Sequence, residues 1–230
     1  MNGRRRAARR RETIDEILAI AVEVMTESGV AGLSLSEVAR RLGIRPPSLY
    51  KYFPSRLALY DRLFRDGQQA YLDHFRAGAA TADPGLPALA AALDSGSRWA
   101  LAHQPLTQLL FWRPVPGFRP SAEAFAPAEA LVEEVRAILR DAVARGQLRA
   151  DAAGEDGAAT LSILVTGVMS QQLANGPDET YDSGTFTRLM PHILTMFRQH
   201  FAPTRDHHAD RASNDRNSRT TSPQPRGRGR

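Results

Sequence analysis

The first regular pattern of apolar and polar positions begins near the N-terminus. Between Thr13 and Gly29 the apolar residues recur at steps of three, four and seven, which places them on one face of a helix. They are Ile14, Ile17, Leu18, Ala21, Val22 and Met25. Thr13 and Glu16 have the spacing of a capping box, and Gly29 stands where helices commonly end. We therefore predict a first helix over residues 13–28.

Two short helices are expected next. Ser34 and Glu37 repeat the capping-box spacing, and the apolar stripe that follows ends at Gly43, which predicts a helix of about eight residues. Pro46 and Pro47 fit the first turn of a third helix, because the N–H groups that they lack would be unpaired there. We expect this helix to run through Tyr52. A pair of short helices joined by a glycine-containing turn, behind a longer helix, is typical of a helix-turn-helix unit.

The helical pattern continues to about residue 201. Pro54 ends the third helix, Ser55 caps a fourth that runs from Arg56 towards Arg76, and the stretch AGAATADPGLP has the composition of a linker. Further helices are predicted over residues 86–103, 105–112, 121–146, 155–174 and 185–201. In the last of these we expect a kink or restart at Pro191. Since no alternating strand pattern of convincing length intervenes, the expected fold is all-α with about nine helices.

Composition narrows the class of protein. The chain has 230 residues and is 42% hydrophobic, which is enough for a core, whereas residues 202–230 have hardly any apolar side chains and are expected to be a disordered tail. The absence of cysteine excludes disulfides and thiolate metal sites, and the six histidines lack metal-binding spacing, so we expect no metal and no cofactor. No apolar run is long enough to span a membrane and no secretory signal is present, so we expect no membrane partner and a cytoplasmic location.

The net charge of +5 is unevenly distributed. Both ends are cationic, since the chain closes on RGRGR and six arginines stand near its start. These are Arg4, Arg5, Arg6, Arg9, Arg10 and Arg11. Clustered arginines favour a polyphosphate or acidic partner, because each neutralised phosphate releases a condensed counterion. On charge alone, solvated tails remain the alternative.

The side chains of the predicted third helix favour contact with nucleic acid over plain packing. Leu49 and Phe53 are expected to face the core. The outward and N-terminal positions are then Arg45, Pro46, Ser48, Tyr50 and Lys51. In a helix-turn-helix unit the second helix enters the major groove, where arginine can bind guanine through two hydrogen bonds and apolar groups can contact thymine methyls.

The stretch GLSLSEVARRLGIRPPSLYKYFPSRLALYDRLF resembles the DNA-binding region of the TetR family of transcriptional repressors. That region is similar to (T/S)xxxVAxxLGVxxxxLYxHFxxKxxL, and the glycine, the aromatic residues and a cation fall in register here. The matching residues are Gly43, Leu49, Tyr50, Phe53 and Arg56. Two positions depart from the family pattern: Arg45 replaces the usual serine or threonine, which leaves the third helix without a side-chain N-cap, and Tyr52 replaces the usual histidine.

The resemblance implies roles for individual residues. Those expected to face bases are Arg45, Pro46, Pro47 and Tyr50. Those expected to face the DNA backbone are Ser34, Ser36, Ser48, Lys51, Tyr52 and Arg56. In the family the N-terminal arm lies beside the operator, so the six arginines are placed to reach the backbone or the minor groove, where arginine is favoured. Whether the arginine-rich ends contact DNA stays open at this stage.

The resemblance also implies an organisation for the whole chain. We expect a basic arm over residues 1–12, a helix-turn-helix domain with the start of the linking fourth helix over 13–64, and a ligand-binding and dimerisation domain over 65–201, before the tail over 202–230. In the family the C-terminal domain is helical, encloses a ligand pocket and dimerises through its last two helices. Here these helices are predicted at about residues 155–174 and 185–201.

Aromatic residues in the middle of the chain are the candidates for the pocket. They favour a small to medium-sized apolar or aromatic ligand, although each residue could instead be part of the core. The candidates are Trp99, His103, Phe111, Trp112, Phe118, Phe125 and Met169.

The resulting hypothesis is a sequence-specific DNA-binding transcriptional regulator. We expect a repressor that binds a palindromic operator in double-stranded DNA as a homodimer and is released by a small-molecule effector. The alternative is a non-specific architectural DNA-binding protein, which the two basic ends would also suit. An enzyme is not expected, because the sequence has no GxSxG, Walker or GxGxxG motif and its acidic residues are scattered.

Overall fold

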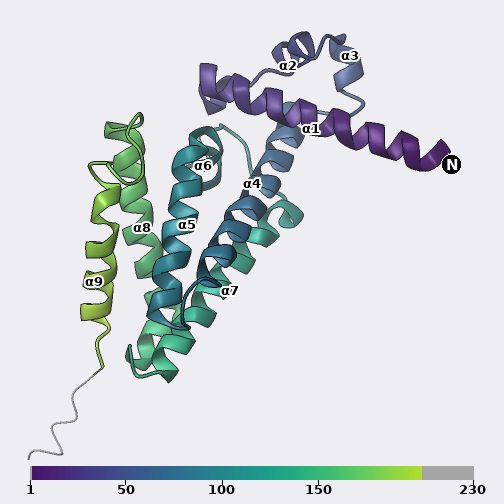
Figure 1. The fold of residues 1–230 in the computed structure, drawn as a ribbon. Helices are drawn as coiled ribbons and strands as arrows, with labels where there is room; N and C mark the ends of the chain where they lie inside the picture. Colours follow the sequence, from purple (N-terminus) through teal and green to yellow (C-terminus); the bar gives the residue numbers. More distant parts are fainter. Residues whose placement is uncertain (1, 204–230) are drawn as a thin grey trace, which may run out of the picture.

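The computed structural model describes residues 2–203, and the regular elements in this range are helices (Figure 1). They comprise nine α-helices and three short 3₁₀ turns, which confirms the all-α prediction. The disordered tail predicted for residues 202–230 lies outside the described residues apart from its first two. Within the described range no helix has the length and apolar character that crossing a membrane requires.

The N-terminal helix is longer than predicted. α1 (Asn2–Ser28) begins at Asn2, and Thr13 lies inside it, where its hydroxyl donates to the Arg9 carbonyl at 2.9 Å. The capping box proposed for Thr13 and Glu16 is therefore wrong. Arginine is a good helix former, so α1 extends through the basic segment although no apolar stripe marks it. Residues 2–12 accordingly form the projecting end of α1 (Figure 1).

The two short helices follow α1 in the sequence, after a 3₁₀ turn (Val30–Gly32). α2 spans Leu35–Arg41 and α3 spans Pro46–Leu49. α3 ends earlier than predicted and continues as a turn, in which the N–H groups of Tyr52 and Phe53 both donate to the Leu49 carbonyl, at 2.9 and 3.0 Å. Pro54 disfavours helical geometry at Phe53, so this segment does not continue as a helix into α4.

Six longer helices complete the described part of the chain. They are α4 (Arg56–Ala79), α5 (Leu86–Ala102), α6 (Gln104–Phe111), α7 (Ala122–Ala144), α8 (Glu155–Asn175) and α9 (Met190–His200), with 3₁₀ turns at Ala150–Ala153 and Thr187–Leu189. The last helix begins at Met190 instead of residue 185, with Pro191 in its first turn. The restart expected at this proline is thus confirmed. α4, α5 and α7 pack together, and α8 and α9 lie on the far side of α5 from α4 (Figure 1).

α4 is the central helix of the fold. Its N-terminal half buries Leu59, Tyr60, Leu63 and Phe64 next to the short helices, and its C-terminal half buries Tyr71, Leu72 and Phe75 among the longer ones. Near its end Gly78 permits close approach to α5, since a Cβ atom added there would lie 2.5 Å from the Ala91 carbonyl oxygen. A single helix therefore carries core residues of both ends of the molecule.

Polar contacts fasten α7 to α4 at several levels. The Asp61 carboxylate accepts hydrogen bonds from the backbone N–H and hydroxyl of Ser121 at 2.7 and 2.8 Å, just before α7 begins. Farther along, ion pairs join Arg65 to Glu123 at 2.8 Å and Arg76 to Glu134 at 2.5 Å. The residue numbers rise together on both helices, so α4 and α7 run side by side in the same direction.

Candidate nucleic-acid interface and cavity

The two short helices are held by an apolar inner side. α2 buries Leu35, Val38 and Ala39, and the α3 segment buries Leu49 and Phe53, as predicted for the last two. They belong to the same core cluster as four α1 residues. These are Ile17, Ala21, Val24 and Met25. The buried side fixes which residues of α3 face outward.

An ionic cluster ties α2 to α1. Arg41 donates to Glu27 of α1 at 2.8 and 2.5 Å, and to Glu37 of its own helix at 2.8 Å. Arg40 donates to Glu37 as well, and these hydrogen bonds lower the pKa of the Glu37 carboxyl to about 2. The second predicted capping box is therefore wrong. Ser34 occupies the N-cap position without a side-chain cap bond, and the Glu37 carboxylate accepts hydrogen bonds from the two arginines instead.

Two further contacts connect the helix-turn-helix unit to α4. The hydroxyl of Tyr60, a fully buried residue of α4, donates to the Val30 carbonyl at 2.5 Å. Ser55 caps α4 by accepting from the Ala58 N–H at 3.1 Å, as expected. The short helices are thus fixed to the first turns of α4, and any displacement of that end of the helix would carry them along.

Most of the residues predicted to contact DNA are exposed. Ser48 and Tyr52 are half-buried, and the Tyr50 side chain is 51% exposed although it is a large aromatic residue. The remaining exposed members are Ser34, Ser36, Arg45, Pro46, Pro47, Lys51 and Arg56. The structure brings four of these residues into one open hollow of about 380 Å³, beside Ser55 and Pro54. The four are Ser34, Ser36, Tyr50 and Arg56.

The start of α3 offers side chains but few backbone donors. Arg45 occupies the N-cap position without a side-chain cap bond, as its departure from the family pattern predicted. Pro46 and Pro47 lack N–H groups, and the N–H of Ser48 already donates to the Arg45 carbonyl at 2.8 Å. Contacts from this turn to a ligand must therefore come from side chains, chiefly the exposed guanidinium of Arg45.

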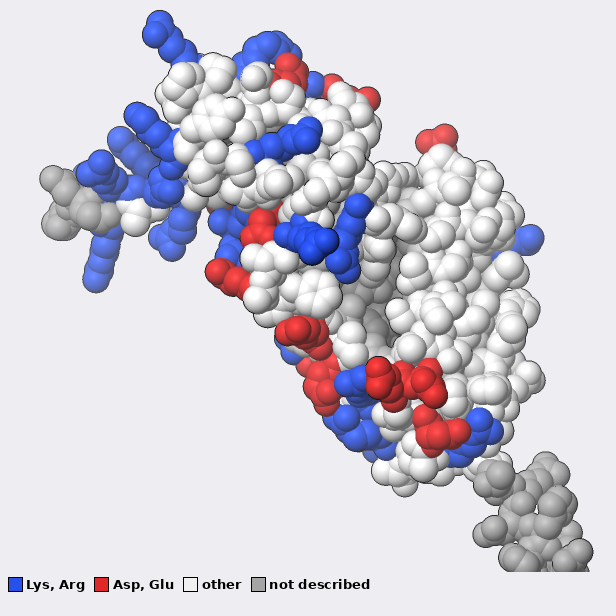
Figure 2. All heavy atoms as spheres, turned by 180° about the vertical axis from the view of Figure 1, so that it is seen from behind, with Lys and Arg blue, Asp and Glu red and all other residues white. Residues whose placement is uncertain are grey.

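The six N-terminal arginines are exposed on the projecting end of α1, where Figure 2 shows a cluster of positive charge. Arg10 places its guanidinium carbon 5.1 Å from the centre of the Tyr52 ring, a cation–π contact. This contact joins the arginine-rich end of α1 to the chain just after α3. The basic segment therefore has a defined position beside the short helices.

A separate cavity of about 330 Å³ lies between α7 and α8. Tyr71 and Phe75 of α4, Leu93 of α5 and Phe111 of α6 form its floor. Apolar residues dominate the walls, which also carry Arg136 from α7. Of the predicted pocket residues, Phe111 lines this cavity, and Phe111, Trp112 and Met169 line a neighbouring space of about 20 Å³.

The other four predicted pocket residues do not line either space. Trp99 is buried and packs edge-on against Tyr71 with the ring centres 5.9 Å apart, while the exposed His103 stacks on Trp99 at 4.7 Å. Phe118 and Phe125 pack against Phe64, nearer the short helices. Tyr71 and Phe75 were missed because apolar positions of an amphipathic helix look alike in a sequence whether they meet a neighbour or a cavity.

Comparisons with known proteins match two segments of the chain. Residues 17–63 match the family of bacterial regulatory proteins described as the tetR family, and residues 89–194 match a tetracyclin repressor-like C-terminal domain. The HTH-type transcriptional regulator Rv1816 of Mycobacterium tuberculosis is 31% identical over 147 residues, which cover 61% of this chain and 62% of the relative. The match therefore spans less than two thirds of that relative's length.

Solved structures share the fold. A protein of unknown function from Rhodococcus sp. RHA1 superposes with a TM-score of 0.68 at 23% identity, covering 82% of this chain and 95% of its own. The TetR family transcriptional regulator PfmR from Thermus thermophilus gives a TM-score of 0.62 at 21% identity, covering 82% and 99%. At these identities the likeness concerns the arrangement of the helices.

The ionic cluster on Glu37 generates a pH prediction. Because the pKa of Glu37 is lowered from 4.5 to about 2 in the folded protein, its stabilising contribution is present above pH 4.5 and is lost as the pH falls towards 2. Thermal unfolding across this range should show a smaller loss of stability with falling pH for Glu37→Gln than for the unchanged protein. Glu23→Gln is the control, since that carboxylate is 4.0 Å from Arg41. An equal pH slope for Glu37→Gln and the unchanged protein would contradict the assignment.

Proposed function

Since this chain belongs to the TetR family of bacterial transcriptional regulators, we propose that it is a repressor that binds a palindromic operator as a homodimer. A small, largely apolar or aromatic ligand in the cavity between α7 and α8 releases it from DNA. It acts in the cytoplasm, where the operator is accessible. The observation that carries the proposal is the set of outward side chains on α3, which project from a segment whose inner side is buried.

The proposed division of labour follows the position of each residue. Arg45, Pro46, Pro47 and Tyr50 face bases in the major groove, while the hollow formed by Ser34, Ser36 and Arg56, together with Tyr50, suits a backbone phosphate. Ser48, Lys51 and Tyr52 complete the backbone contacts. Arg45, with an exposed guanidinium at the tip of α3, is the residue that sets the base preference of this repressor.

Exposed apolar residues on α8 and α9 support the homodimer. Ile163 of α8 is 72% exposed, and Met196 of α9 is 56% exposed. On α8 the neighbours of Ile163 along the same face, Ala159 and Gly167, are small and exposed, so a second helix can approach closely. Monomeric proteins seldom expose large apolar side chains as a contiguous patch to solvent, and a second copy of the chain would bury this one.

The release mechanism uses the attachment of α7 to α4. A ligand that fits better when α7 and α8 stand farther apart would displace α7, and the contacts of α7 with Asp61, Arg65 and Arg76 would pass the displacement to α4. The Tyr60 bond to Val30 then carries the short helices along. The ligand would lower operator affinity by its own preference for that conformation, and operator DNA would lower ligand affinity equally.

The arginine-rich end of α1 favours a second candidate function. A non-specific architectural protein would bind DNA through these charges alone, with no preference for sequence. The repressor hypothesis instead gives the arginines an auxiliary role beside each half-site, with about three to five of them on phosphates. The two functions differ in whether replacing α3 side chains changes sequence preference.

Tyr50→Ala tests the role of α3. Removing a base contact should lower affinity for an operator selected from random DNA by about 1–3 kcal/mol, or roughly 5- to 150-fold, while non-specific affinity stays the same. Lys51→Ala, a change at a backbone contact, should weaken both kinds of binding alike. Fluorescence anisotropy with operator and scrambled duplexes measures both affinities. If Tyr50→Ala keeps the full preference for the operator, the assignment of α3 is wrong.

Replacing Arg4, Arg5, Arg6, Arg9 and Arg11 by alanine tests the basic segment. Alanine preserves the helix, and Arg10 keeps its contact with Tyr52. The slope of log affinity against log salt concentration should fall by about 0.9 for each phosphate that is no longer neutralised. Lysine at the same positions retains the charge and should retain most of the slope. An unchanged slope in the alanine variant would remove these arginines from the interface.

Ile163→Asp tests the dimer. A carboxylate buried between two α8 helices would be desolvated without a partner, so the variant should be monomeric by light scattering and should bind a full operator much more weakly. Ala126→Asp places the same charge on an exposed position of α7 and should leave the dimer intact. A dimeric Ile163→Asp variant would exclude this face as the interface.

A further inference from the structure

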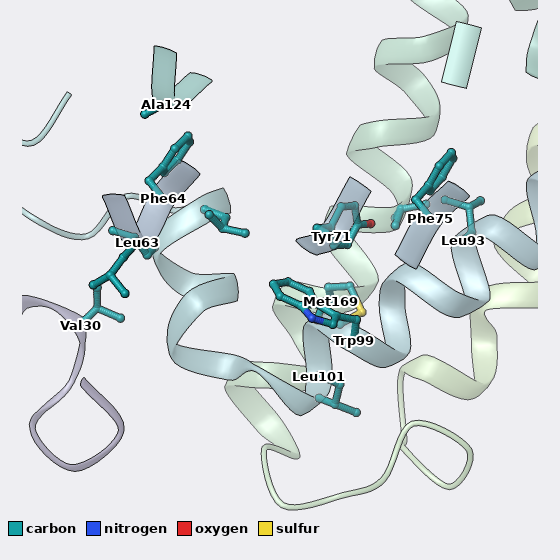
Figure 3. Packing of buried hydrophobic residues seen from close by; sticks show 14 of the residues in the cluster. Val30, Leu63, Phe64, Tyr71, Phe75, Leu93, Trp99, Leu101, Ala124 and Met169 are labelled. Atoms are coloured by element: carbon teal, nitrogen blue, oxygen red, sulfur yellow. The ribbon is translucent and has the colours of Figure 1, made fainter. Parts of the chain in front are cut away.

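Tyr71 is held rigidly at one end of the cavity. Trp99 and Phe111 pack edge-on against its ring, with centres 5.9 and 5.5 Å away. Gly96 of α5 makes room for it, because a Cβ atom added to Gly96 would lie 3.1 Å from the Tyr71 hydroxyl. Figure 3 shows that hydroxyl directed towards the side on which Phe75 and Leu93 lie, and both of these residues line the cavity. The position of the phenol is therefore fixed by its neighbours.

The Tyr71 hydroxyl has no hydrogen-bond partner among the described residues, although the residue is only 6% exposed. Burial raises the pKa of Tyr71 to about 12, so the phenol stays protonated and remains a hydrogen-bond donor. Buried hydroxyls of tyrosine normally find a partner, since leaving one unpaired is unfavourable. Since Tyr71 lines the cavity, its hydroxyl is placed to donate to an acceptor on a molecule bound there.

The polar groups of the cavity are separated along its length. Thr166 of α8 lies at the Tyr71 end, because both residues also line the small neighbouring space. Glu155 is eleven residues earlier on α8, which is about 16 Å at 1.5 Å per residue. On α7, Arg136 follows the Glu134 partner of Arg76 and so lies beyond the level of Tyr71 on α4. Glu155 and Arg136 thus stand at one end of the cavity and the Tyr71 and Thr166 hydroxyls at the other, with Ser162 and mainly apolar residues between them.

Building on the effector role proposed for this cavity, we propose that the ligand is a neutral, mainly apolar molecule with a carbonyl oxygen that accepts a hydrogen bond from Tyr71. Ketones, esters and lactones belong to this class. The volume of about 330 Å³ suits a small molecule.

The alternatives fit the cavity less well. A pure hydrocarbon would leave the Tyr71 hydroxyl unpaired. A carboxylate at the Tyr71 end would be buried against neutral groups without a cation, which is costly, and at the other end Glu155 lines the cavity along with Arg136 and would repel it. A neutral carbonyl satisfies the hydroxyl without bringing a charge into the apolar walls.

Three probes with matched chain length test the proposal in the absence of DNA: methyl hexyl ketone, octanoate and octane. Trp99 contacts Tyr71, so its fluorescence reports binding, and a Trp112→Phe background removes the second tryptophan. The ketone should bind saturably and more tightly than octane or octanoate. Tyr71→Phe should weaken ketone binding by about 2- to 12-fold, the worth of one hydrogen bond, and leave octane binding unchanged.

Several results would overturn the proposal. They are equal ketone affinity with and without the Tyr71 hydroxyl, a preference for octanoate that Arg136→Gln abolishes, and no saturable change with any probe. The preference among probes in the protein that retains Tyr71 decides the matter if Tyr71→Phe folds poorly. Operator binding measured separately keeps the two proposals apart. A ketone that binds without weakening operator binding would support the ligand class and contradict the release mechanism.

Discussion

α4 takes part in two interactions that must be satisfied by one rigid helix. Tyr60 donates a buried hydrogen bond to Val30, next to the short helices, and Tyr71, about 16 Å farther along, lies on the floor of the cavity. Between these points the helix buries Leu63 and Phe64 in the common core. Because packed interiors do not deform continuously, the proposed regulation has a change at the cavity end passed on as a displacement of the whole helix. The proposed regulation depends on this shared element more than on any single contact.

The surface proposed to face DNA follows from the same packing. α3 contains only four residues. Its orientation is determined by two buried side chains, Leu49 at its end and Phe53 in the turn that follows. With two prolines in its first turn it has few backbone donors to offer, so specificity is assigned to side chains, Arg45 and Tyr50 above all. The arginine-rich start of α1 lies beside this surface, and in the proposed complex it adds charge without sequence information, as phosphate contacts generally do.

The sequence predicted the fold class and the placement of most helices because periodic apolar positions report the buried face of a helix directly. It was less informative at helix ends. α1 starts at Asn2 because arginine prolongs a helix without any apolar signal, and the spacing of Ser34 and Glu37 could not reveal that Arg40 and Arg41 compete for the carboxylate. The cavity was the hardest part: Trp99 and Phe118 proved to be core, whereas Tyr71 lines it, since a cavity arises from the spacing of α7 and α8 and leaves no mark in either helix.

The most direct measurement is a footprint of the protein on the DNA that flanks its own coding region. We expect one protected palindrome, with two half-sites on the same face of the duplex and their centres about one helical turn, or a multiple of it, apart. Protection spread evenly over the fragment, or lost equally from any competitor sequence, would contradict the central claim that the outward side chains of α3 read a specific operator.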